Sequence, residues 1–277
     1  MALKKTEIMF QRALSNLNAT EPKFEVNGFE LKVMKKFKYL GGQLAENAKL
    51  DEEINFRIQR ASANFSRLYQ RVWKKRHLTT SLKAQIYRTT VVPALTYGCE
   101  TWVWTRDQMA KLEGVQYRFL RSIAGKTWKD KVSYTHLIST LAKYNENFDW
   151  ANETNKGVAL IAIETYCRLA RLRYVGQVER MPDDRIPKMI MHGEISLGQR
   201  YPGRPLKSFK QSIKDDLVCF DIWEKYQDTG QSLKTLTEDR EKWRKLINKQ
   251  AQIFQQSWQR KRNEQSQARH QKNPQIT

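Results

Sequence analysis

Apolar and charged residues alternate along the first part of the chain. Residues 23–33 (KFEVNGFELKV) show this alternation on both sides of Asn27-Gly28. An Asn-Gly pair suits a type I′ turn, which needs positive φ at both central residues. The pattern therefore predicts a β-hairpin over 23–33. Shorter strands are expected at 6–10 and 37–42.

From Asp51 the hydrophobic period changes from 2 to about 3.6, which is typical of a helix. Asp51 is suited to cap the first turn. The apolar positions then recur every three or four residues, at Leu50, Ile54, Ile58, Ala61, Phe65, Leu68 and Val72. Such spacing predicts one long helix whose single apolar stripe faces a core.

Further helices are expected over 80–100, 106–124, 131–144, 157–181, 205–219 and 235–262. Pro93 should interrupt the first of these, and Gly125 should end the second. After Arg262 the apolar positions cease, which favours disorder in the tail. The fold class expected is therefore mainly α, with a short β region at the N-terminus.

Cationic residues form a second row beside the apolar stripe of the long helix. The row consists of Arg57, Arg60, Arg67, Arg71 and Lys74. From Ile54 to Arg88 the sequence has nine Lys or Arg and no Asp or Glu. A solvated helix face usually mixes both signs, because oppositely charged pairs four residues apart stabilise it. The row indicates an anionic ligand along this flank; a merely soluble basic face is the alternative.

The whole chain is strongly basic. It has 50 Lys and Arg against 29 Asp and Glu, a net charge of +21, in 277 residues. Nucleic acid is the first partner this suggests and an acidic membrane surface the second. No apolar stretch approaches the roughly 18 residues that cross a bilayer, and no signal-peptide pattern is seen at residues 1–15. Three cysteines far apart favour a reducing, intracellular location with buried thiols.

Several longer stretches follow one another in a specific order. They are LKKTEIMF, KFKYLGG, LDEEINFRIQRASANFSRLYQRVW, TTVVPALTYGCETWVW, LEGVQYRFLRSIAG, RLRYVGQVERMPDDRIPK, GRP and DREKWRKLI. In this order, over about residues 3–250, the chain resembles the C-terminal part of a non-LTR (LINE-type) retrotransposon reverse transcriptase. The resemblance implies four regions: a palm remnant with primer-grip-like strands over 1–48, a helical thumb-like domain over 49–150, a helical C-terminal region over 151–262, and a disordered basic tail over 263–277.

The same resemblance implies where nucleic acid would be bound. The residues are Lys5 in the palm segment, Phe37, Tyr39, Leu40 and Gly41 in the primer grip, and the cationic row in the thumb. A thumb holds any sequence, so it should contact the sugar–phosphate backbone and not base edges. Lys5 could instead be an ordinary surface lysine, and residues 37–41 could instead form a core strand.

Paired carboxylates are the first candidates for chemistry, because two of them can hold magnesium for phosphoryl transfer. In RMPDDRIPK (180–188), however, Pro182 before Asp183-Asp184 favours a turn or a helix N-cap. The second pair, in KDDLV (214–218), is interpreted as a solvated helix face. The [FY]-A-D-D hairpin and the first aspartate motif of the family do not occur in this chain.

Other catalytic or metal sites find little support. The four histidines lie 56 or more residues apart, and no cysteine pair has zinc spacing. Cys99 lacks an obvious base, which favours a buried thiol over a nucleophile. Trp73 is a candidate for base stacking or, alternatively, for core packing. We therefore assign no catalytic residue, cofactor or metal; magnesium is implied only for the full-length family enzyme.

Taken together, the sequence predicts a truncated reverse-transcriptase fragment without catalytic aspartates. It should bind template–primer or other nucleic acid, RNA or duplex, independently of sequence, and should not polymerise alone. The alternative is a helical protein-interaction or scaffold module without a nucleic-acid role.

Overall fold

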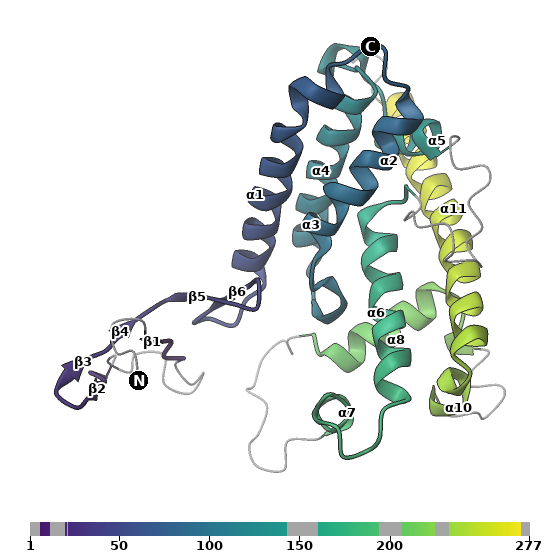
Figure 1. Ribbon diagram of the computed structural model, residues 1–277. Coiled ribbons are helices and arrows are strands. Elements are labelled where there is room, and N and C mark those ends of the chain that lie inside the picture. Colours follow the sequence, from purple (N-terminus) through teal and green to yellow (C-terminus); the bar gives the residue numbers. More distant parts are fainter. Residues whose placement is uncertain are drawn as a thin grey trace.

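The computed structural model describes residues 6–11, 20, 22–142, 160–193, 207–224 and 233–272. It is mainly helical, with a few short strands at the N-terminus, which confirms the predicted fold class. The strands lie to one side of the helices and join them at the foot of α1 (Figure 1). Within the described residues, no helix is long and apolar enough to cross a membrane.

The strands form pairs. β1 (Glu7–Ile8) runs parallel to β4 (Lys32–Val33). β2 (Glu25–Val26) and β3 (Phe29–Glu30) form the predicted hairpin, whose turn has φ values of 53° at Asn27 and 78° at Gly28. A second hairpin joins β5 (Lys36–Tyr39) to β6 (Gly42–Ala45), where the sequence predicted only one strand.

The long helix begins as α1 (Asp51–Arg67) and continues after Leu68 as a π-helical turn, η3 (Tyr69–Trp73). Asp51 is the first helical residue and Leu50 precedes it, without a side-chain cap, so the predicted N-cap at Asp51 is wrong. The apolar stripe is confirmed. Ile54, Ala61, Phe65 and Val72 are buried in the core.

The helices that follow α1 pack with it around a first core. They are α2 (Thr80–Thr90), α3 (Val92–Thr96), α4 (Arg106–Ile123) and α5 (Tyr134–Ala142). Single turns occur at η4 (Cys99–Thr101) and η5 (Trp128–Asp130). Pro93 stands in the first turn of α3, and Gly125, with φ of 65°, follows the end of α4, as the sequence predicted.

Helices α1 and α4 lie side by side and run in the same direction. Lys111 near the start of α4 hydrogen-bonds to Asn55 near the start of α1. Further along, the rings of Phe65 and Phe119 stack with centroids 4.4 Å apart. Both helices therefore end at the same end of the molecule, the upper one in Figure 1.

The second core forms around α6 (Ile163–Glu179), whose first half also belongs to the first core. Its other members are α7 (Ile186–His192), α8 (Phe209–Cys219), α10 (Leu233–Glu238) and α11 (Arg240–Lys272). Trp243 of α11 donates its ring N–H to the carbonyl of Leu172 at 3.0 Å. Its ring also occupies the space that a Cβ at Gly176 would need, so α6 and α11 approach closely at that glycine.

The C-terminal helix differs from the prediction. The sequence predicts that regular structure stops after Arg262, yet α11 continues to Lys272, so the disordered tail is wrong for residues 263–272. Residues 273–277 lie outside the described part. Arg262 pairs with Glu113 at 2.6 Å, and Asn263 accepts a hydrogen bond from Thr135 at 2.6 Å. These contacts anchor α11 at the point where the sequence predicted its end.

Candidate nucleic-acid interface

Arg57, predicted to belong to the exposed cationic row, is buried with 5 % exposure. Its Nε lies 2.5 Å from Oε1 of Glu53, and its Nη2 donates to the carbonyl of Gly41 at 2.5 Å. The guanidinium also lies over the ring of Tyr97, 4.5 Å from its centroid. Arg57 therefore joins α1 to the β5–β6 turn, and its predicted role as a phosphate contact does not fit this geometry.

The β5–β6 turn is held against α1 and the chain after α3 by three residues. Besides the Arg57 bond, Glu53 accepts the backbone N–H of Gln43 at 2.5 Å, and the hydroxyl of Tyr97 donates to the carbonyl of Leu40 at 2.9 Å. We call Glu53, Arg57 and Tyr97 the hairpin clamp. The i to i+4 spacing of Glu53 and Arg57 was a signal that sequence reasoning missed.

The clamp holds the backbone of Leu40 and Gly41, two of the residues expected to form a primer grip, and leaves side chains of the turn in solvent. Tyr39 is 59 % exposed and Leu40 is 78 % exposed. Leu40 and Gly41 have φ values of 46° and 88°, as a tight turn requires. Phe37 is half-buried, with its ring 6.5 Å from that of Tyr39. The core-strand alternative therefore does not describe the tip, because Tyr39 and Leu40 pack against no core.

The other members of the cationic row face solvent. Arg60 and Arg67 are exposed on α1, and Arg71 and Lys74 are exposed on η3 and just after it. Lys75 and Arg76 continue the same exposed run. We call these six residues the basic face. Among the residues that the structure describes, no carboxylate forms an ion pair with them.

One cation of the hairpin lies beside this face. Nζ of Lys38 on β5 is 5.8 Å from the ring centroid of Phe56, and the guanidinium of Arg60 is 5.9 Å from the same centroid. Lys36, in contrast, pairs with Glu52 at 2.7 Å and is neutralised. The hairpin thus adds Lys38 to the positive potential around α1. Lys5 lies outside the described residues.

The remaining basic residues of this stretch serve the core. Nζ of Lys83 donates to the carbonyl of Trp73 at 3.0 Å and is buried, and Arg88 is buried too. Trp73 itself is 4 % exposed, stacks on Phe65 at 4.8 Å and donates its ring N–H to the carbonyl of Phe65 at 2.7 Å. The core interpretation of Trp73 is therefore confirmed, and base stacking at that residue is wrong.

The structure places Asp183-Asp184 in a turn before α7, as the sequence predicted. Asp183 is exposed and pairs with Lys188 at 2.8 Å. A hydrogen bond from Lys188 lowers the pKa of Asp183. Across the described residues, no group of three or more His, Cys, Asp or Glu side chains is placed to hold a metal.

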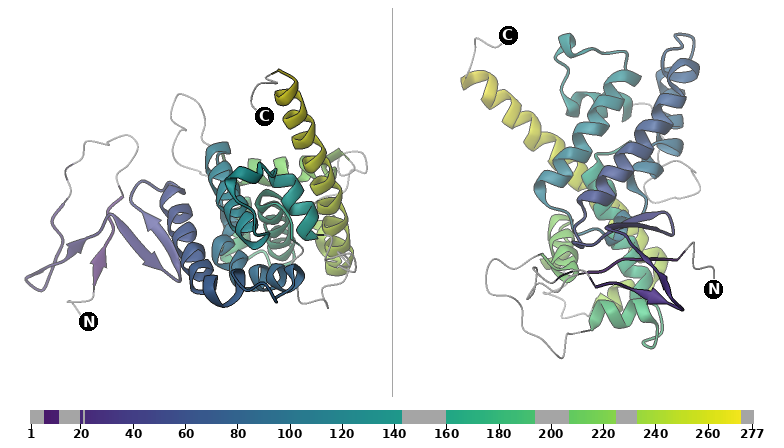
Figure 2. Two further views of the ribbon diagram at one scale, coloured as in Figure 1. Left: turned by 90° about the horizontal axis from the view of Figure 1, so that it is seen from above. Right: turned by 90° about the vertical axis from the view of Figure 1, so that its left-hand side faces the viewer.

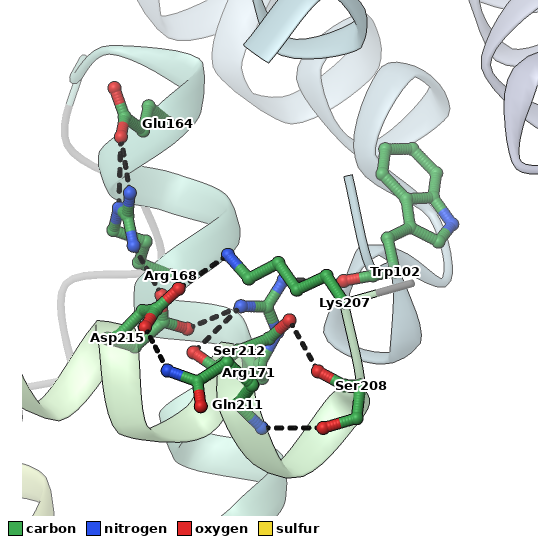
Figure 3. Close-up of polar contacts among 10 residues, drawn as sticks. Trp102, Glu164, Arg168, Arg171, Lys207, Ser208, Gln211, Ser212 and Asp215 are labelled. Atoms are coloured by element: carbon green, nitrogen blue, oxygen red, sulfur yellow. Dashed lines mark hydrogen bonds and ion pairs between the residues drawn. The ribbon is translucent and has the colours of Figure 1, made fainter. Parts of the chain in front are cut away.

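The interpretation of KDDLV as a solvated face is wrong for Asp216. That carboxylate is fully buried between α6 and α8, 2.5 Å from Nη1 of Arg168 and 2.7 Å from Nη1 of Arg171. Arg168 also pairs with Glu164 at 2.6 Å, so two guanidinium groups meet two carboxylates (Figure 3). Burial raises the pKa of Asp216 to about 6, against the lowering effect of both arginines.

Arg171 connects this charged network to the first core. It is 1 % exposed, donates to the carbonyl of Trp102 at 2.5 Å, and lies 3.9 Å from the centroid of the Trp104 ring. Figure 3 shows Arg171 between Trp102 and the α8 residues Gln211 and Ser212. The Arg171 side chain therefore links the TYGCETWVW and RLRYVG stretches, which lie about 70 residues apart in the sequence.

The three cysteines differ in exposure. Cys99 and Cys167 are buried, as predicted. A hydrogen bond with Cys167, together with burial, raises the pKa of the Cys99 thiol well above its usual value. Cys219 is exposed, which differs from the prediction of buried thiols. It ends α8 on the side away from Leu217.

Comparison of the chain with protein-family models, with curated proteins and with solved structures found no match.

Proposed function

We propose that this chain binds duplex nucleic acid through the sugar–phosphate backbone, with the basic face of α1 and η3 as the main contact. The observation that carries the proposal is the exposure of six cations with no described carboxylate partner. Clustered like charges repel one another, and neutralising phosphates with them releases counterions from the nucleic acid. Contacts of this kind carry no sequence information, so the binding should be independent of sequence.

The hairpin clamp supports a second contact. It bonds the tip of β5–β6 to the helix that carries the basic face. Tyr39 and Leu40 project into solvent from that fixed turn. In the proposal this tip touches the end of a strand whose phosphates lie along α1, as a primer grip does beside a thumb.

This arrangement agrees with the resemblance to the C-terminal region of a non-LTR retrotransposon reverse transcriptase. We propose that the chain corresponds to the rear of the palm, the thumb and the helical C-terminal region of such an enzyme. The magnesium-binding aspartates of the family belong to motifs that this sequence does not contain. The chain alone should therefore bind template–primer without extending it.

A salt titration with a matched pair of variants tests the proposal. The first variant replaces Arg60, Arg67, Arg71 and Lys74 by Gln. The control replaces four exposed lysines of α10 and α11, namely Lys234, Lys242, Lys245 and Lys249, by Gln. Both variants lose four positive charges, and Gln preserves helix propensity. Affinity for a blunt RNA–DNA hybrid is measured between 50 and 200 mM salt.

The wild-type affinity should fall steeply with salt, with a slope near −5 on a log–log plot for about six phosphate contacts. The first variant should lose about four of those contacts and most of the slope, whereas the control should keep the slope. Equal losses of affinity in both variants would contradict the proposal, because binding would then depend on the total charge of the chain and not on the basic face. Extension of a primed template by the wild-type chain with magnesium would contradict the absence of catalysis.

A further inference from the structure

Trp128 stands apart from the other tryptophans that the structure describes. It is 73 % exposed, on the turn η5 between α4 and α5. Trp73, Trp102, Trp104, Trp243 and Trp258 are buried, and Trp223 is half-buried. A single exposed apolar residue is common on protein surfaces and needs no explanation by itself. The backbone and charges around Trp128 provide the explanation in this case.

The turn that carries Trp128 is fixed at both ends. On entry, the N–H of Lys126 bonds to the carbonyl of Arg121 at 2.9 Å. Thr127 and Asp130 form a reciprocal cap around the tryptophan, in which Asp130 accepts the backbone N–H of Thr127 at 2.6 Å and its hydroxyl at 2.8 Å. On exit, Lys131 adopts φ of 46°, and the carbonyl of Val132 accepts a hydrogen bond from the hydroxyl of Tyr117 at 2.6 Å. The indole therefore projects from a defined turn.

The sequence on both sides of this indole is rich in lysine. Residues 126–131 read KTWKDK, so three lysines accompany one acid. Nζ of Lys129 lies 5.9 Å from the centroid of the Trp128 ring. The acid, Asp130, is engaged by Thr127 and lies 3.9 Å from Lys126; the hydrogen bond from the Thr127 backbone lowers its pKa. The turn thus offers an aromatic face beside a net positive charge.

The turn also lies at the end of the molecule where the basic face ends. Because α1 and α4 are parallel neighbours, η3 and the segment after α4 emerge on the same side, which both Figure 1 and the right-hand view of Figure 2 show. A strand that follows the basic face toward Lys74, Lys75 and Arg76 is directed to this end.

We propose that Trp128 is a stacking platform for an unpaired nucleobase, with Lys126 and Lys129 holding the neighbouring phosphates. Base stacking on an aromatic ring tolerates any base, since each has a π-face, and nearby cations hold the backbone. The inference rests on the proposed function: the basic face holds the duplex, and Trp128 takes the first unpaired base beyond its end.

The test compares three probes with one duplex: blunt, with a short single-stranded overhang, and with the same overhang made abasic. The two overhangs carry equal phosphate charge, so their difference isolates the bases. The two overhang probes are each made with a DNA or an RNA overhang, at the 5′ or the 3′ end of the strand. Affinities are measured for the wild type, Trp128→Ala, Trp128→Phe and a control, Ile186→Ala, which removes an exposed side chain from α7.

The wild type and the control should bind at least one overhang with bases about tenfold more tightly than its abasic counterpart, within the range known for stacking of one base. Trp128→Ala should lose this difference and keep its affinity for the blunt duplex, while Trp128→Phe should retain part of it. Thermal unfolding of the variants should match the wild type, because the indole is exposed.

Two results would overturn the inference. One is equal binding of base-containing and abasic overhangs by the wild type. The other is an undiminished preference in Trp128→Ala. The salt-dependent affinity for the blunt duplex reports separately on the basic face, so the platform can fail while the proposed function stands. If the wild type bound none of the three probes, both the stacking platform and the proposed function would be overturned.

Discussion

The basic face and the contact between α6 and α8 are both rich in arginine, but their arginines have different surroundings. Arg60 and Arg67 face water, with no ion pair to a described carboxylate. Arg168 and Arg171 lie in the interior, where Asp216 and Glu164 balance their charge. All four guanidinium groups stay charged at neutral pH. All four arginines carry the same charge, so the presence of a carboxylate partner distinguishes the structural arginines from those proposed to contact a ligand.

Arg57 is a paired, buried arginine like Arg171, although the sequence places it in the same row as Arg60 and Arg67. Its charge is matched by Glu53, and its Nη2 donates to the carbonyl of Gly41. The comparison therefore predicts large effects on stability at Asp216, intermediate effects at Arg57, and effects on binding alone at Arg67.

The largest effect on stability is expected from Asp216→Asn. The substitution leaves Arg168 and Arg171 in the interior with one carboxylate fewer, and breaking a buried pair in this way costs about 3–5 kcal/mol. Urea unfolding followed by circular dichroism measures the loss. The adjacent Asp215→Asn is the control, because Asp215 forms a partly exposed pair with Lys207 at 2.7 Å. Such a pair contributes about 0–1 kcal/mol.

Equal losses in the two aspartate variants would contradict the comparison. They would mean that Asp216 is hydrated in solution and that Arg171 does not depend on it. A third variant, Arg171→Met, sharpens the result, because the thioether fills part of the space without charge. It leaves Asp216 with Arg168, and it should be destabilised less than Asp216→Asn if the uncompensated positive charge is the main cost.

An intermediate effect is expected from Arg57→Gln. The variant loses a charge-assisted hydrogen bond to Gly41 and leaves Glu53 with the backbone N–H of Gln43 alone. Hydrogen bonds to charged groups contribute about 1.5–3 kcal/mol each, and that range is the expected loss in the free energy of unfolding. Proteolysis within residues 36–45 should accelerate, because the clamp holds this hairpin on α1.

Nucleic-acid binding distinguishes the two roles of Arg57. If it positions the hairpin, Arg57→Gln lowers affinity for the hybrid without changing the slope of log affinity against log salt. If it contacts a phosphate, the slope falls by about 1. A reduced slope together with an unchanged free energy of unfolding would mean that Arg57 contacts a phosphate, as the basic face does.

The sequence predicts most of the described helices because their apolar positions are spaced at the helical period, but it missed α7, and the one helix expected over 235–262 is divided into α10 and α11. The same spacing also shows that Arg57 should be buried and not exposed. Arg57 follows Ile54 by three residues and precedes Ala61 by four, so it lies on the buried side of α1. Asp216 likewise follows Ile213 by three and precedes Phe220 by four. In both cases a charge on an apolar side signalled a buried partner.

Other features had no local signal. The bond between Tyr97 and Leu40 joins residues 57 apart, and Arg171 reaches Asp216 across 45 residues. Such pairs depend on how helices pack, which periodicity does not encode. The continuation of α11 past Arg262 also depends on distant contacts, with Glu113 and Thr135. The exposure of Trp128 likewise follows from its place on a turn between two packed helices, whereas its sequence neighbours only show that it is surrounded by lysines.

The smallest effect on stability, and the cleanest effect on binding, is expected from Arg67→Gln. Arg67 ends α1 with its side chain exposed, and surface substitutions of this kind change the free energy of unfolding by less than about 0.5 kcal/mol. Affinity for the hybrid should fall to a similar extent for any base sequence, and the salt slope should fall by about 1, because one phosphate contact is lost. Lys249→Gln, an exposed cation of α11, is the matched control and should leave the slope unchanged. An unchanged slope for Arg67→Gln would mean that the unpaired cations of α1 are solvated only, and the contrast with the paired arginines of α6 would then have no functional meaning.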